Sequence, residues 1–414
     1  MPSDLYVRKP YKEPWRREDV NEVPPEIFCV RFYHPCEPLQ NPILRLHAFE
    51  HSQLSLSTAP PEHRAPTIKW GVHHQTARIA CSILACNRWD GYFSSARDRT
   101  KIDESEELLT ENDYLFIVPG PENYPVVEDF RSWPFPRDNL PPSWNFTIPS
   151  TPGQDAQGDP TLGSACAVTN AGNVLQHYHI VPTSERSWFA TNHMGGDQEP
   201  VNSMGLAMDI TANCLTVRAD IGKLFEDNRI CIVPKTAMLK PDGVPTYCIA
   251  NASSRSVNLV LHVLFAGFQS PTELYKQYHN VSLHQLRDIS PDYLFAAFAK
   301  GIFLRCSYFQ ADNREREAIT LDTSGACPRL IAYTRKLSAE TINPTREDRL
   351  SMKRPWSGRR SDSCDGTDDA DAGNRICDHV RGGTSRQSED RGPASRRLDR
   401  EVYTPASPGY ADGL

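Results

Sequence analysis

Residues 175–182 read LQHYHIVP, and this stretch is the starting point for predicting the fold. Val174–Val181 has the composition of a β-strand, and Pro182 follows it. Ala165–Thr169 is a second strand candidate, and the linking residues Asn170-Ala-Gly-Asn173 include types that tolerate positive φ angles. With a helix expected over Glu185–Met194, the sequence predicts a β-hairpin that is followed by a helix.

Other segments on both sides extend this pattern. They are His73-His-Gln-Thr-Ala77, Asp138-Asn-Leu-Pro-Pro-Ser-Trp144, Ser184-Glu-Arg-Ser-Trp-Phe-Ala-Thr-Asn-His-Met194, Asn213-Cys-Leu-Thr-Val-Arg218 with a helix expected over Arg218–Asp227, and Ile232-Val-Pro-Lys235. In this order, over about residues 40–310, the chain resembles the HNH endonucleases that are common in filamentous fungi. The resemblance implies an α+β fold in which a ββα-metal (HNH) module is embedded in a larger mixed scaffold. The activity it implies is metal-dependent hydrolysis of nucleic-acid phosphodiester bonds.

The resemblance also assigns roles to individual residues. His179 matches the general base, a task that suits an imidazole because its unperturbed pKa is about 6.5. Asn213 matches the asparagine that holds the His-bearing strand and the helix in register. We therefore expect His179 at a strand end, facing the helix that carries Gly222. One divalent cation, expected to be Mg²⁺, would bind the scissile phosphate and stabilise its developing charge.

The sequence departs from the family at the metal ligands. Gly222 stands where the resemblance implies a helical His, and a glycine offers no ligand. Tyr178 stands where an Asp or His often precedes the general base, and a phenol with a pKa of about 10 is a poor substitute. Glu226 lies one helical turn beyond Gly222 and is the remaining candidate, because Mg²⁺ often takes only one or two protein carboxylates. A solvated acid at the helix end is an equal alternative for Glu226.

Two functions therefore remain open. The first is an endonuclease that uses His179, Asn213 and a metal held partly by Glu226; the second is a catalytically degenerate HNH-fold protein that binds or regulates. DNA is a possible partner, but the charge of the chain does not support it. The formal net charge is −7, and residues 161–240 contain six Lys/Arg against seven Asp/Glu. Nothing indicates a small-molecule cofactor. The ligand set around His179 discriminates between the two functions.

The two ends of the chain differ from its middle. Residues 342–414 contain 13 Lys/Arg, 13 Asp/Glu and no Phe, so they cannot bury enough apolar surface to offset chain entropy. We expect disorder over 1–26 and 342–414, an N-terminal α+β region over 27–150, an HNH-like domain over 160–240, and strands and helices that pack on the core over 241–341. The elements expected within these regions are strands at 27–33, 43–49, 114–118, 229–234, 247–250 and 257–265, and helices at 74–86 and 293–305 and from 271 onward.

Other classes of protein are disfavoured. The longest apolar run, Tyr293–Ala299, is far shorter than the roughly 20 residues of a membrane-spanning helix. The first thirty residues contain no apolar signal core, so we expect an intracellular protein, cytoplasmic or nuclear, with a weak basic cluster over 353–360. The 12 cysteines include no Cys-x-x-Cys pair, which argues against structural zinc. The pairs His73-His74 and His47/His51 are not expected to chelate a metal, because the first diverges on a helix and the second lies on extended chain.

Overall fold

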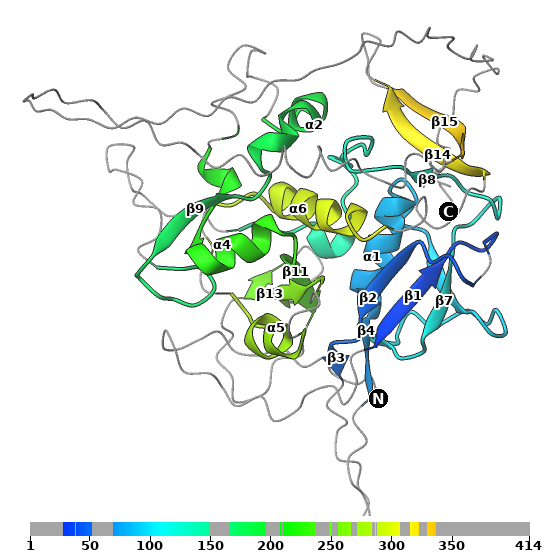
Figure 1. The fold of residues 1–414 in the computed structure, drawn as a ribbon, viewed down its shortest axis with the longest axis horizontal. Coiled ribbons are helices and arrows are strands. Elements are labelled where there is room, and N and C mark those ends of the chain that lie inside the picture. The colour runs from blue at the N-terminus through cyan, green and yellow to red at the C-terminus, as the bar shows by residue number, and fades with distance from the viewer. Residues whose placement is uncertain are drawn as a thin grey trace, which may run out of the picture. The chain divides into compact units, whose positions relative to one another are not determined.

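Short strands and a few helices alternate along the chain, so the computed structural model has a mixed α+β fold with several small sheets (Figure 1). The structure describes residues 28–37, 39–51, 69–148, 165–195, 208, 210–236, 248–250, 256–265, 271–283, 286, 288–306, 315–322 and 329–336. All of them belong to one compact unit of the chain. The segments predicted to be disordered, 1–26 and 342–414, lie outside the described residues.

The N-terminal region is built on a four-stranded sheet with the order β2-β1-β7-β5. Arg31 on β1 and Asp113 on β7 form a bidentate pair with two contacts of 2.7 Å, which ties these parallel strands together. The strands predicted at 27–33, 43–49 and 114–118 are all present in this sheet. Its members are β1 (Cys29–Tyr33), β2 (Leu44–His47), β5 (Tyr92–Ser95) and β7 (Asp113–Ile117).

The predicted helix at 74–86 is present as α1 (His74–Leu84), and it is buried along most of its length. After α1, Asn87 adopts a positive φ of 64° and its side chain bonds to the indole of Trp133 and to the carbonyl of Pro134. The proline-rich passage that follows β7 is thereby fixed to the core. Its large aromatics Trp133 and Trp144 are 0% and 1% exposed, so this passage lies against the core rather than in solvent.

Several smaller strands complete this part of the fold. One sheet has the order β3-β4-β6 and another the order β15-β14-β8. The elements are β3 (Glu50–His51), β4 (Trp70–His73), β6 (Leu108–Leu109), β8 (Val126–Val127), the 3₁₀ turn η2 (Pro142–Trp144), β14 (Glu315–Asp322) and β15 (Arg329–Lys336). Because β8 pairs with β14, residues nearly 200 positions apart share one sheet.

The middle of the chain contains the strand predicted to end at His179, but its partner is not the predicted one. β9 (Leu175–His179) pairs antiparallel with β10 (Cys214–Arg218), and α4 (Ala219–Glu226) follows β10 directly. The prediction of a strand at 165–169 was wrong. There, the N–H of Asn170 bonds to the carbonyl of Cys166 and the N–H of Cys166 bonds to the carbonyl of Ala171, which closes a tight turn.

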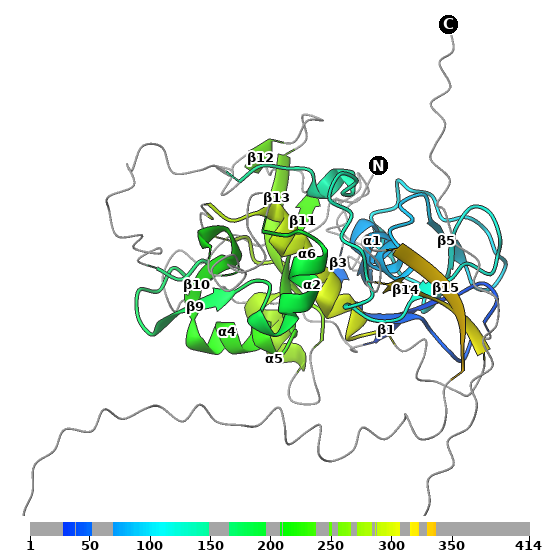
Figure 2. The same cartoon turned by 90° about the horizontal axis from the view of Figure 1, so that it is seen from above.

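The remaining elements surround this strand pair and confirm most of the predictions for the region. A three-stranded antiparallel sheet has the order β11-β13-β12. Helix α6, whose cap Ser290 accepts a hydrogen bond from the N–H of Asp292, packs on β11 and α1 (Figures 1 and 2). The elements are η3 (Thr183–Glu185), α2 (Arg186–Thr191), η5 (Thr211–Asn213), β11 (Ile230–Thr236), β12 (Cys248–Ala250), β13 (Ser256–Val263), α5 (Pro271–Tyr278) and α6 (Pro291–Phe303).

Candidate functional site

The strand pair β9–β10 and helix α4 carry the residues that the sequence singled out. His179 is the last residue of β9 and is paired with Cys214, the first residue of β10. His179 is half-buried, and His177 is exposed. Since the strand ends at His179 and the helix starts where β10 ends, β9, β10 and α4 form a ββα arrangement beside the predicted general base.

Asn213 lies at the junction between these elements and is fully buried. Its side-chain Oδ1 accepts a hydrogen bond from the N–H of Val181 at 2.8 Å. Its Nδ2 donates to the carbonyls of Val181 at 3.1 Å and Met208 at 2.9 Å. The backbone carbonyl of Asn213 also accepts a bond from the N–H of Ile180. Asn213 therefore holds the chain that leaves β9 against the chain that enters β10.

The face of β9 that meets α4 is formed by Gln176 and Tyr178. A Cβ atom built on Gly222 would lie only 1.7 Å from Nε2 of Gln176, so the amide of Gln176 fills the space over this glycine. The ring of Tyr178 stacks on Phe225, with 5.2 Å between the ring centroids. Side chains alternate along a strand, so we infer that His177 and His179 share the other face of β9, of which His179 is the last residue. The expectation that His179 faces α4 stays a prediction.

The two remaining candidate ligands do not form a cation site. Burial, together with the charge of Glu226, raises the pKa of Tyr178, which keeps its phenol neutral at physiological pH. Glu226 itself is exposed and forms an ion pair with Lys223 at 3.3 Å. Among the described residues, the one group of three or more His, Cys, Asp or Glu with converging ligand atoms lies elsewhere and contains neither His179 nor Glu226. The donors at this position therefore do not fit the Mg²⁺ that the resemblance implies.

A small cavity lies beside Tyr178 and Phe225, and its walls are mostly apolar. Its volume of about 20 Å³ has room for roughly one water molecule. The lining residues are Tyr178, Ile180, Leu215, Phe225, Asn228, Ile230, Cys231, Ile232, Leu294, Ala297 and Lys300. Such walls offer no oxygen or nitrogen ligand set for a cation.

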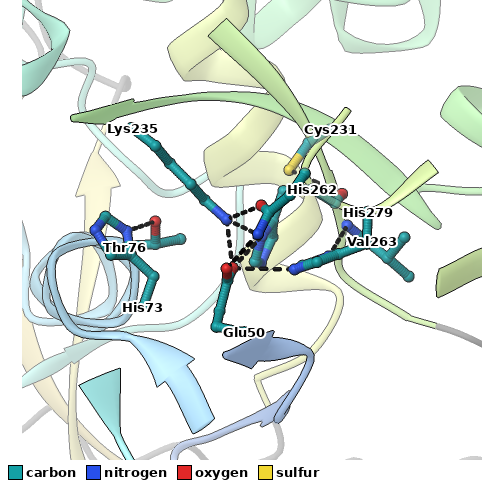
Figure 3. A network of polar contacts seen from close by, with 9 residues as sticks. Glu50, His73, Thr76, Cys231, Lys235, His262, Val263 and His279 are labelled. Atoms are coloured by element: carbon teal, nitrogen blue, oxygen red, sulfur yellow. Dashed lines mark hydrogen bonds and ion pairs between the residues drawn. The ribbon is translucent and has the colours of Figure 1, made fainter. Parts of the chain in front are cut away.

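A second polar cluster, which we call the Glu50 cluster, is fully buried between β3, β11, β13 and the residues after α5. It consists of Glu50, Lys235, His262, His279 and Asn280. Figure 3 shows the lysine and histidine side chains directed at the Glu50 carboxylate. Oε1 of Glu50 accepts bonds from Nζ of Lys235 and, at 3.0 Å, from Nε2 of His279. Its Oε2 accepts a bond of 2.5 Å from Nδ2 of Asn280.

Glu50, His262 and His279 each offer a ligand atom, and these atoms lie within 4.8 Å of one another. A buried group of this kind could hold a metal ion. Imidazole nitrogens are ligands for transition metals such as Zn²⁺ rather than for Mg²⁺. Sequence reasoning missed the cluster because its members are up to 230 positions apart and form no motif. The available signal was Lys235 itself, a charged residue within an otherwise apolar strand.

His73 lies beside this cluster at the end of β4, where its Nδ1 is 2.8 Å from the hydroxyl of Thr76 (Figure 3). Burial, together with the charge of Lys235, lowers its pKa to about 3. Burial likewise lowers the pKa of His279 to about 3, against the opposing effect of Glu50. Both rings are therefore neutral at physiological pH. His74, the adjacent residue, is the first residue of α1, and its Nδ1 is hydrogen-bonded to the carbonyl of Glu106.

Comparison of the chain with protein-family models, with curated proteins and with solved structures found no match. Within the part of the chain that the structure describes, no helix combines the length and apolar character needed to cross a membrane.

Proposed function

We propose that the chain is an HNH-type ββα protein that has lost phosphodiester hydrolysis and acts as a binding or regulatory module. One observation carries this proposal: the two β9 side chains that face α4 are Gln176 and Tyr178, and they meet Gly222 and Phe225. An amide, a neutral phenol, a glycine and a benzyl ring replace the ligands that hydrolysis would need.

The chemistry explains why this replacement matters. Hydrolysis of a phosphodiester needs a cation that binds the phosphate and stabilises the charge that develops on it. Ionised carboxylates and neutral imidazoles can hold such a cation, whereas a neutral phenol is a weak acceptor. Glu226 alone is an exposed carboxylate in an ion pair with Lys223, and a single exposed carboxylate is not a ligand set. Without a bound cation, His179 could take a proton from water, but that water would have no activated phosphate to attack.

Asn213 is a residue of the implied family motif that this chain keeps, and its role is to stabilise the fold. The buried Asn213 side chain bonds twice to the backbone of Val181, just after β9, and once to the carbonyl of Met208, whether or not the site hydrolyses DNA. Retention of this bracing asparagine together with loss of the ligands supports a degenerate enzyme. Binding or regulation then rests on the surface of the module rather than on a reaction.

A weakly active endonuclease is the second candidate, and the position of His179 favours it. His179 ends β9 beside the Asn213 brace, which is where the resemblance implies a general base. In that case Glu226, phosphate oxygens and water would have to complete the Mg²⁺ shell.

Plasmid nicking in the presence of Mg²⁺ or Mn²⁺ tests the proposal. We expect the wild-type protein and His179→Ala to give the same background rate, because no bound cation activates the phosphate. Metal-dependent nicking by the wild type that disappears in His179→Ala would replace the proposal with the nuclease function. Gel-shift measurements with short duplex DNA would then show whether the non-catalytic protein still binds nucleic acid.

A further inference from the structure

The Glu50 cluster resembles a metal site in its residue types, but Lys235 occupies its centre. Nζ of Lys235 contacts Oε1 of Glu50, lies 2.5 Å from Oδ1 of Asn280, and lies 3.4 Å from Nδ1 of His262. An ammonium group has three N–H donors, and these three contacts provide three acceptors. Lys235 is 0% exposed, so bulk solvent does not reach its ammonium group.

The hydrogen bonds of His279 also oppose metal ligation. Its Nδ1 accepts a bond from the backbone N–H of Val263 at 3.3 Å, so its Nε2 carries the proton and donates to Glu50 at 3.0 Å. A histidine that binds a metal through Nε2 usually donates its Nδ1–H to an acceptor. Here Nδ1 faces a donor, so the Nε2 lone pair is not available to a metal without rearrangement of the ring.

The charges of the cluster also balance without a metal ion. Burial alone would raise the pKa of Glu50, but the charge of Lys235 and the hydrogen bond from His279 hold it well below its usual value. The carboxylate is therefore ionised, and the ammonium balances it. A divalent cation at the same position would lie next to a buried positive charge that has no solvent to screen it.

We propose that the Lys235 ammonium is the resident cation of this site, and that Lys235 excludes a transition metal from Glu50, His262 and His279. The internal ion joins β3, β11, β13 and the end of α5 in a metal-independent charge cluster. This inference does not rest on the function proposed above.

The first test is a metal and chelator experiment on the untagged full-length protein, grown with added Zn²⁺. We expect elemental analysis to give the same zinc content for the wild type and for Glu50→Gln, because any zinc bound elsewhere is common to both. We also expect EDTA to leave the melting temperature of the wild type unchanged. Stoichiometric zinc in the wild type that is lost in Glu50→Gln, together with a lower melting temperature in EDTA, would overturn the proposal.

The second test is a double-mutant cycle between Lys235 and Glu50. Lys235→Met leaves an unpaired buried carboxylate and should lower the melting temperature by about 10 °C, whereas the double variant Lys235→Met/Glu50→Gln should recover roughly half of the loss. Lys300→Met is the matched control, since Lys300 is only partly buried and its contact with Glu185 is 3.9 Å long. A metal site would behave differently: Lys235→Met would then keep both the wild-type melting temperature and the zinc that the wild type already contains. If Lys235→Met does not fold, the zinc and EDTA measurements on the wild type still decide the question.

Discussion

For Asn213, the sequence predicted the bracing role of the side chain but not the groups that it binds. The resemblance implied a bracing role, and the structure provides its partners, the backbone groups of Val181 and Met208. Lys235 illustrates the opposite case. It appeared in the sequence only as part of a family segment, and no local pattern could bring Glu50 to it from 185 positions away.

At this scale we predict that Asn213→Ala destabilises the fold severely. The change leaves the buried N–H of Val181 and two carbonyls without a side-chain partner, which should cost about 3 kcal/mol of unfolding free energy. Urea denaturation followed by tryptophan fluorescence measures this loss. His177→Ala is the control on the exposed face of β9 and should change stability by less than about 0.5 kcal/mol. Equal stabilities for the two variants would show that the Asn213 bonds are not structural.

Single histidines also make the stability depend on pH. His34 is buried, and burial lowers its pKa to about 4 although a bond to the carbonyl of Tyr124 opposes this shift. Since the unfolded state then binds a proton that the folded state excludes, stability is lost as the pH falls from about 6.5 towards 4. At pH 5 the loss from this residue should be on the order of 2 kcal/mol.

Urea midpoints at pH 7 and pH 5 check this prediction, with His34→Gln as the variant that does not titrate. We expect the difference between the two pH values to shrink in His34→Gln. An unchanged difference would assign the acid sensitivity to the other buried histidines, His73 and His279 among them.

At the scale of elements, local patterns predicted most helices and strands but not their pairing. The strand at 174–181, the helix at 218–227 and the two C-terminal helices follow from composition, caps and periodicity. The predicted hairpin was wrong because the turn at Asn170 closes on itself, and the partner of β9 lies some 40 positions along the chain in β10. Turn chemistry indicates where a chain can reverse, but the pairing of strands depends on contacts between residues far apart in the sequence.

The contact between β9 and α4 gives a second prediction, which concerns Gly222. An interior glycine normally costs a helix roughly 0.5–1 kcal/mol relative to alanine. Here the added Cβ meets Nε2 of Gln176, so Gly222→Ala alone must first displace that amide. We therefore expect Gly222→Ala to stabilise the Gln176→Ala background by more than it stabilises the wild type. Thermal melting of the four proteins measures the coupling, and strict additivity would show that Gln176 does not restrict this position.

At the scale of the whole molecule, composition predicts a folded middle and a disordered tail over 342–414. The apolar core draws on residues from all three central regions, between Val30 and Ile319. We predict that deletion of residues 346–414 leaves the melting temperature within a few degrees of the wild-type value, because the deleted charges are balanced and the aromatics few. A larger loss would mean that the tail packs on the core.

Calorimetric titration with Mg²⁺ and Mn²⁺, with and without short duplex DNA, tests most directly whether the ββα unit has lost its cation site. The comparison is between the wild type, His179→Ala, Glu226→Gln and a variant that restores ligands, Tyr178→Asp/Gly222→His, combined with Gln176→Ala to make room for the new side chain. We predict that the first three proteins bind the metals equally weakly and that the restored variant gains a saturable site. Saturable binding by the wild type that is lost in His179→Ala or in Glu226→Gln would contradict the loss of the site.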